Sequence, residues 1–162
     1  MPIRVRLANL EDAQDVARLN EVVQALHRDH RPDRFAAADA AAFLPIVEEW
    51  LRNAEVAVFV AVDDETSVVL GYVTAIFSSR RSNVLVYGAQ VVELDQLAVD
   101  PSRRGEGVGT ALCEEVLRAA AARRVERIEL STWVFNEPAR RLFARLGFEV
   151  DFVRMSRATP FA

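Results

Sequence analysis

The segment from Arg103 to Thr110 constrains this chain most, because three glycines alternate at positions 105, 107 and 109 directly ahead of an apolar pattern with helical spacing. The residues before it have the character of a strand. The glycines therefore mark a turn from a strand into the first turn of a helix, where backbone N–H groups have no partner within the helix. Glycine adopts positive φ and lets a ligand approach the backbone, and two arginines add positive charge. The segment predicts a phosphate or pyrophosphate site.

The length and composition predict one globular domain spanning residues 1–162, because 162 residues with 51% hydrophobic content can fill one core. The chain has 20 basic and 24 acidic residues and a net charge of -4, which argues against a nucleic-acid partner. All of the basic residues are arginine. The absence of lysine excludes Schiff-base chemistry on a lysine and a P-loop lysine.

The few metal-binding and thiol side chains predict a protein without a disulfide or a metal. Cys113 is the single cysteine, and the two histidines have no structural zinc spacing. These features favour a reducing, cytoplasmic location. The N-terminal residues lack the apolar core of a signal peptide, and no apolar run approaches the roughly 20 residues that span a bilayer, so we expect no membrane partner.

Hydrophobic periodicity predicts an α/β or α+β order of elements, in which two helices follow the first strand and a run of antiparallel strands precedes the glycine turn. The expected strands lie at residues 3–7, 56–62, 68–77, 84–99, 127–133 and 148–157. The expected helices lie at about residues 10–27, 39–53 and 107–124, with a short one that begins at residues 136–138 and ends at Gly147. Polar loops are expected at residues 27–34 and 78–83, an irregularity near Gly88, and a kink or a helix start at Pro45.

Two nucleotide-binding patterns fit the glycine turn poorly. A P-loop requires Gly-Lys-Ser/Thr, which a chain without lysine cannot supply. A dinucleotide-binding unit has Gly-x-Gly-x-x-Gly early in a parallel sheet, whereas this chain has Gly-x-Gly-x-Gly after several hairpin strands.

The stretch from Leu97 to Thr110 resembles the acetyl-CoA signature of the GNAT family of N-acetyltransferases. The family pattern Gln/Arg-x-x-Gly-x-Gly/Ala is matched by Arg104, Gly107 and Gly109. Asn136, Ala139 and the helix end at residues 146–148 are similar to the second half of that family. The resemblance implies a single acyltransferase domain, with a mixed, mostly antiparallel sheet whose central strands splay apart between flanking helices.

The resemblance also implies which residues bind the co-substrate acetyl-CoA. Backbone N–H groups between residues 104 and 110 would hold the pyrophosphate, Leu97 and Val99 would pair through their backbone with the pantetheine arm, and Asn136 would contact the same arm. A helix cap is the compatible alternative for Asn136. The predicted acetyl-CoA contacts are Leu97, Ala98, Val99, Arg103, Arg104, Gly105, Glu106, Gly107, Val108, Gly109, Thr110, Asn136, Ala139 and Phe143.

Two carboxylates are the predicted catalytic groups, because transfer of an acetyl group to an amine requires a base that removes a proton from the amine. By the period of two, Glu93 and Asp95 share one face of the central strand with Leu97 and Val99. When two carboxylates lie close together, the pKa of at least one of them rises, and the pair attracts a cationic amine. Glu93 also resembles, by its distance from the glycines, the catalytic glutamate of the histone-acetylating members of the family. The alternative is a pair of solvent-facing charges.

The family's usual general acid is a tyrosine, and Phe143 occupies the matching position in this chain. A water molecule, another hydroxyl group or no acid at all would then serve the departing thiolate. Tyr87, Ser131 and Thr132 are weaker substitutes. The resemblance places residues 27–35 at the mouth of the acceptor site, where a histidine could relay a proton or simply be solvated.

The predicted function is therefore an acetyl-CoA-dependent N-acetyltransferase that acts by direct attack of an amine in a ternary complex. The alternative is a non-catalytic acyl-CoA-binding or sensor module, which the missing tyrosine favours. The predicted acceptor is a small-molecule or peptide amine, and a homodimer is in keeping with the family. The sequence leaves open the identity of the acceptor, the acyl-chain preference and the choice of base between Glu93 and Asp95.

Overall fold

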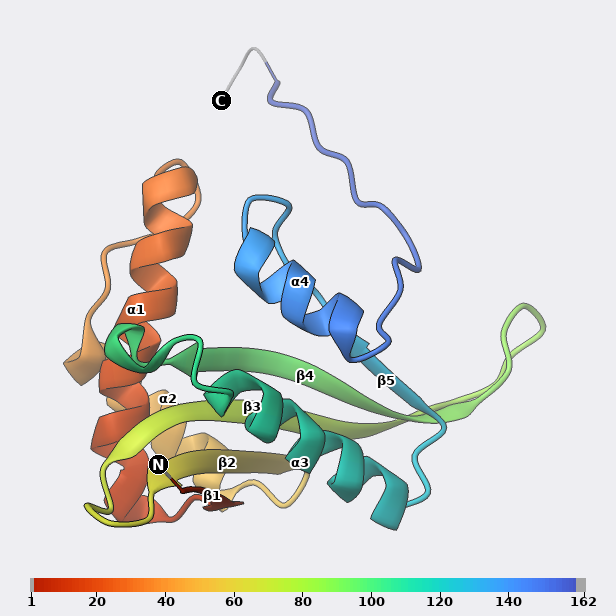
Figure 1. Ribbon diagram of the computed structural model, residues 1–162. Coiled ribbons are helices and arrows are strands. Elements are labelled where there is room, and N and C mark those ends of the chain that lie inside the picture. The colour runs from red at the N-terminus through yellow and green to blue at the C-terminus, as the bar shows by residue number, and fades with distance from the viewer. Residues whose placement is uncertain (1, 160–162) are drawn as a thin grey trace. The chain divides into compact units, whose positions relative to one another are not determined.

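The computed structural model describes residues 2–159, which fall into two compact units, one ending at Ser131 and one beginning at Thr132. The first unit holds a five-stranded sheet in the order β1-β2-β3-β4-β5 (Figure 1). Strands β1 to β4 are antiparallel neighbours, and β5 runs parallel to β4. The predicted mixed, mostly antiparallel sheet with flanking helices is confirmed. The strands are β1 (Ile3–Leu7), β2 (Val56–Asp63), β3 (Val69–Arg80), β4 (Ala89–Val99) and β5 (Arg127–Leu130).

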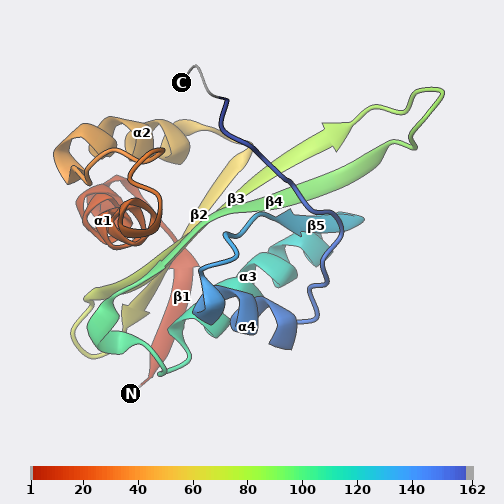
Figure 2. The same ribbon diagram turned by 90° about the horizontal axis from the view of Figure 1, so that it is seen from above.

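Helices cover both faces of this sheet (Figure 2). One face packs against α1 (Ala13–His30) and α2 (Ala40–Arg52), and the other against α3 (Val108–Ala122). Apolar side chains repeat along α1, which buries one side, whereas β2 is buried on both faces and contributes alternate residues to the core against α1. The resulting core between the sheet and the first two helices includes Val16, Leu19, Val47, Val58, Val60, Val62, Tyr72 and Ala98.

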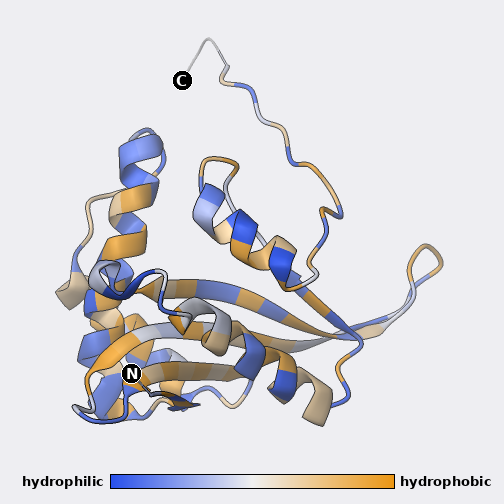
Figure 3. Ribbon diagram, viewed as in Figure 1, coloured by the Kyte–Doolittle hydropathy of each residue, from blue (hydrophilic) through white to orange (hydrophobic). Residues whose placement is uncertain are grey.

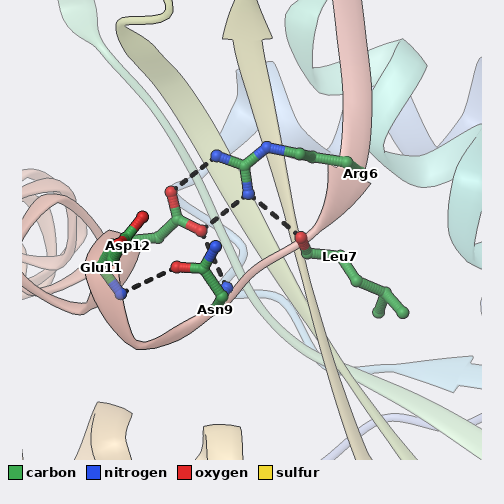
Figure 4. Close-up of polar contacts among 5 residues, drawn as sticks. All are labelled: Arg6, Leu7, Asn9, Glu11 and Asp12. Atoms are coloured by element: carbon green, nitrogen blue, oxygen red, sulfur yellow. Dashed lines mark hydrogen bonds and ion pairs between the residues drawn. The ribbon is translucent and has the colours of Figure 1, made fainter.

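The start of α1 is fixed by polar groups that close the turn after β1 (Figure 4). The guanidinium of Arg6 donates two hydrogen bonds to the carboxylate of Asp12, at 2.7 and 2.8 Å. The same carboxylate accepts from the backbone N–H of Asn9, whose side chain accepts from Glu11. These contacts satisfy the free N–H groups at the entry of the helix. They fix the path of the chain from the edge strand to the helix.

The two N-terminal helices form where predicted, but α1 ends later than expected. Helix α1 continues to His30, so the first residues of the polar stretch at 27–34 are helical and not a loop. Asp39 caps α2 through the N–H of Ala42, and the helix continues through Pro45. The second predicted helix is therefore confirmed, and Pro45 is not its start.

The loop between β3 and β4 lies later in the chain than predicted. Strand β3 runs on to Arg80, so the loop consists of residues 81–88, and the segment from Val84 to Tyr87 is loop and not strand. This loop is the end of an extended arm, and its apolar tip appears in Figure 3. The strand irregularity expected near Gly88 is wrong, because Gly88 lies in this loop. The β3–β4 register instead shifts between Thr74 and Ala75.

The second unit contains one helix, α4 (Glu137–Arg145). Asn136 accepts a hydrogen bond from the N–H of Ala139, and Gly147 ends the helix at φ 88°. The strand predicted for residues 148–157 is wrong, because these residues form no strand in the structure. Their alternating pattern supplies the side chains of a strand, but a strand also needs a neighbour for its backbone groups. None of the described helices is both long and apolar enough to cross a membrane.

Candidate functional site

Strand β4 presents an open backbone edge over its second half. Its pairing with β5 ends at Leu94 and Leu130, although β4 continues to Val99. The N–H groups of Gln96 and Asp100 bond to β3. Because N–H groups alternate in direction along a strand, those of Leu97 and Val99 point to the opposite edge, where β5 has ended. This is the edge on which the sequence predicts backbone pairing with an extended ligand.

The glycine turn follows this edge within eight residues and leads into α3. Gly105 and Gly107 adopt φ of 80° and 88°, and a Cβ atom at either position would meet no atom within 4 Å. Helix α3 begins at Val108 and has no side-chain cap. Its first N–H groups are therefore available to an anion. The phosphate site at residues 104–110 stays a prediction, and the backbone of this turn leaves room for it.

The charged side chains of the turn are mixed in sign. Arg103 donates to the Glu106 carboxylate at 3.1 Å, and Arg104 is exposed. Val108 is buried, and Gly109 and Thr110 form the rest of the first turn of α3. The turn thus offers backbone donors and one exposed arginine beside an internal ion pair.

The prediction that Glu93 and Asp95 share one face of β4 with Leu97 and Val99 is wrong, because the strand contains a bulge. Glu93 pairs with Ile76 and Leu94 with Ala75, but the next pair joins Gln96 to Thr74. Asp95 is therefore the extra residue, and the alternation of side chains changes phase there. A period of two cannot reveal an inserted residue from sequence alone.

The bulge divides the predicted residues between the two faces of the sheet. Leu97 and Val99 face α3, because Val99 is opposite Gly71, and a Cβ atom added to Gly71 would lie 3.1 Å from Val108 Cγ1 on α3. Ala98, opposite Tyr72, belongs to the core against α1. Glu93 lies on this same α1 face. The Glu93 carboxylate therefore lies across the sheet from the side chains of Leu97 and Val99.

The two carboxylates differ in their surroundings. Glu93 and Asp95 are both exposed. The protein around Asp95 removes water from its carboxyl and raises its pKa, although a hydrogen bond with Gln96 opposes the shift. Burial raises the pKa of the Tyr72 phenol, and the negative charge of Asp95 raises it further.

A group of polar side chains that the sequence did not single out surrounds the bulge. The Asn20 Nδ2 atom on α1 donates to the Tyr72 hydroxyl at 2.9 Å and to Gln96 Oε1 at 3.4 Å. The N–H of Gln96 donates to Thr74 Oγ1 at 2.9 Å. A signal for this group exists in the sequence, because Asn20 follows Val16 by four residues and so falls on the apolar stripe of α1.

The remaining predicted residues lie in other parts of the chain. Phe143 packs edge to face with Phe148, with ring centres 5.8 Å apart. Tyr87 lies in the loop at the end of the β3–β4 hairpin, away from the bulge, and is 97% exposed. The His27 ring packs against Phe35 at a tilt of 36°, with ring centres 4.9 Å apart, and burial lowers the pKa of His27. Within residues 2–159, no three metal-binding side chains gather at one place.

Solved structures identify the class of protein that has this fold. A tetramutant of the BH1408 protein of Bacillus halodurans superposes with a TM-score of 0.91 at 26% identity, over 96% of this chain and 99% of that chain. An aminoglycoside N-acetyltransferase in complex with CoA has the same fold, with a TM-score of 0.75 at 22% identity over 98% and 95% of the two chains. The fold is thus shared with an acetyltransferase.

The family model of the acetyltransferase (GNAT) family matches residues 20–148, so the chain belongs to this family. The resemblance found in the glycine turn is confirmed. A curated relative, an uncharacterized N-acetyltransferase of Methanocaldococcus jannaschii, is 40% identical over 60 residues, which are 37% of this chain and 26% of the relative. The chain therefore spans about a quarter of the length of that relative.

Proposed function

We propose that this protein is an acetyl-CoA-dependent N-acetyltransferase that acetylates an amine by direct attack in a ternary complex. One observation carries the proposal: the open edge of β4 from Asp95 to Val99 leads directly into a glycine turn with free helix N–H groups. An extended arm that ends in a pyrophosphate matches both parts. Membership of the acetyltransferase family supports the choice of acetyl-CoA.

The donor side of the site consists of backbone groups. Residues 104–110 would hold the pyrophosphate through N–H groups, and the exposed Arg104 would add charge. The N–H and C=O groups of Leu97 and Val99 would pair with the amide groups of the pantetheine arm. Bound acetyl-CoA supplies an activated acetyl thioester. In the second unit, Asn136, Ala139 and Phe143 stay predicted contacts of the same ligand.

The acceptor side consists of the two carboxylates of β4. An amine is protonated near neutral pH and must lose a proton before it can attack. Glu93 is exposed and can accept this proton, directly or through water, while Asp95 adds a second negative charge that attracts the ammonium form. The phase change at the bulge supports this division, because it turns Glu93 away from the side chains of Leu97 and Val99. A small-molecule or peptide amine fits an acidic acceptor site of this kind.

Phe143 bears on the departing thiolate and on the alternative function. Its ring packs on Phe148 and has no proton to donate. A thiolate is a tolerable leaving group, so transfer can proceed with water as the proton source. A non-catalytic acyl-CoA-binding module is the second candidate, and the phenylalanine at this position favours it.

Thiol release from acetyl-CoA, measured with a panel of amines, tests the proposal. Cys113 is 1% exposed and its pKa is raised to about 12, chiefly by burial, so the protein adds little background to a thiol assay. We expect turnover with at least one amine, and Glu93→Gln to lower kcat by about 10²- to 10⁴-fold with acetyl-CoA affinity retained.

The matched control is Glu114→Gln, which removes an exposed carboxylate from α3 and should leave kcat unchanged. Calorimetric binding of acetyl-CoA without thiol release for any amine would favour the non-catalytic module. A protein that binds no acetyl-CoA would contradict both candidate functions.

A further inference from the structure

The bulge at Asp95 is held by a polar group that crosses the core. Three polar side chains are buried among the described residues: Asp12, Asp63 and Thr74. The first two bond to backbone N–H groups of the turns in which they lie. Thr74 is 1% exposed in the middle of β3 and instead binds a neighbouring strand. Its hydroxyl therefore has a role other than closing a local turn.

That role is visible in the register of β3 and β4. In a regular antiparallel ladder, a strand N–H donates to a backbone carbonyl of its neighbour. At the bulge, the N–H of Gln96 donates to the side-chain oxygen of Thr74. The inserted Asp95 displaces the ladder at this point, and the Thr74 hydroxyl satisfies an N–H group that would otherwise be unpaired.

Helix α1 holds the same point from above the sheet. Asn20 reaches Tyr72 on β3 and Gln96 on β4 with one Nδ2 atom. Tyr72 is fully buried, and its hydroxyl obtains a partner in this way. Buried polar groups destabilise a core unless all of them are bonded, and a fully bonded group specifies one arrangement. These contacts connect three elements at the residue where the strand changes phase.

We propose that Thr74 and Asn20 are positioning residues for acetyl transfer, which hold the β4 bulge at Asp95 so that the carboxylate of Glu93 faces α1 while the Leu97–Val99 backbone keeps its open edge. The inference rests on the proposed function. If the same residues formed a regular strand with no bulge, the alternation of β4 would place the two carboxylates on the same face as Leu97 and Val99. The bulge therefore decides which face of the sheet receives the amine.

A pair of substitutions at Thr74 tests the inference. Thr74→Val keeps the shape and removes the oxygen, whereas Thr74→Ser keeps the oxygen. We expect Thr74→Val to lower kcat about 10- to 100-fold with an unchanged KM for acetyl-CoA, the effect of a displaced reacting group. Thr74→Ser should restore most of kcat. Asn20→Ala should lower kcat in the same direction as Thr74→Val.

Val16→Ala is the control for lost stability. Val16 is fully buried on the same side of α1 as Asn20, and its side chain makes no hydrogen bond to Asn20, Tyr72, Thr74 or Gln96. Val16→Ala should lower the melting temperature and leave kcat unchanged. An unchanged kcat in Thr74→Val would overturn the inference. A loss of kcat in Val16→Ala as large as that in Thr74→Val would overturn it as well.

A structural measurement separates this inference from the proposed function. The amide hydrogen of Gln96 should exchange faster in Thr74→Val than in Thr74→Ser, since only the serine variant retains its acceptor. A protein without turnover for any amine would overturn the proposed function, and this exchange difference would still report on the bulge. Equal exchange in the two variants would overturn the inference by itself.

Discussion

Gly107→Ala should weaken acetyl-CoA binding much more than it weakens the fold. Gly107 has φ 88°, and a Cβ atom there meets nothing within 4 Å, so the substitution adds backbone strain without a steric clash. A non-glycine residue in this region costs about 1–2 kcal/mol. The lower entropy of the unfolded alanine chain offsets about 0.4–1 kcal/mol of this. The net loss in the free energy of unfolding is about 1 kcal/mol, or a fall of about 2–4 °C in melting temperature.

The effect on the ligand is larger because relief of the strain rotates the N–H groups that start α3. A hydrogen bond to a charged group is worth about 1.5–3 kcal/mol, so loss of one predicts a dissociation constant for acetyl-CoA about 10- to 100-fold higher by calorimetry. Gly147→Ala is the matched control, with the same φ of 88° and the same open space. It should cost similar stability and no affinity. Equal affinity of the two variants for acetyl-CoA would refute a phosphate role for Gly107.

Three further predictions concern ionisable groups. Cys113 should react with thiol reagents only on unfolding, because burial raises its pKa to about 12; rapid labelling of the folded protein would contradict this. Burial acts to raise the pKa of Asp12, but the hydrogen bonds of this carboxylate with Arg6 and Asn9 outweigh burial and hold the pKa below 3.8. The ionised Asp12 therefore stabilises the fold above pH 3.8, and this stabilisation is lost as the pH falls through the lowered pKa. Asp12→Asn should therefore cost about 2 kcal/mol at neutral pH in denaturant unfolding, and the cost should shrink in acid. The raised pKa of Asp95 means that its charge is lost at a higher pH than 3.8 as the solution is acidified. The KM for the amine should rise as pH falls through that pKa, and a KM independent of pH between 4 and 6, a window set roughly by carboxyl titration, would contradict it.

The sequence predicts those parts of the fold in which a local pattern decides the structure. The apolar residues of α1 keep helical spacing along the helix, and β2 is a continuous apolar run. Both elements form where expected. Gly107 marks the start of α3 because only a residue tolerant of positive φ fits there. Residues 148–157 have an equally clear alternation and form no strand, because the pattern of side chains does not supply a backbone partner.

The candidate site was predictable on its donor side and less so on its acceptor side, for a physical reason. Backbone donors at a helix start follow from glycine spacing alone, and Gly105 and Gly107 reveal them. The orientation of Glu93 depends on the register between two strands, and one inserted residue reverses it. Thr74 and Asn20 are 54 positions apart by their numbers, and no local pattern connects them.

The position of the bulge suggests why a base and an open backbone edge can coexist on a single strand. Each residue of a regular strand directs its side chain to one face and its backbone groups to one edge, and both alternate together. A regular β4 would therefore tie the face of the carboxylates to the edge on which Leu97 and Val99 lie. The bulge at Asp95 uncouples the two. If the proposed chemistry is correct, a deletion of Asp95 should leave acetyl-CoA binding at the edge and the glycine turn intact and should retain turnover, since Glu93, opposite Ile76, would still face α1 in the regular ladder. Loss of the Asp95 charge should then appear as a higher KM for the amine. Abolished turnover with intact acetyl-CoA binding in such a variant would show that Glu93 alone does not supply the base.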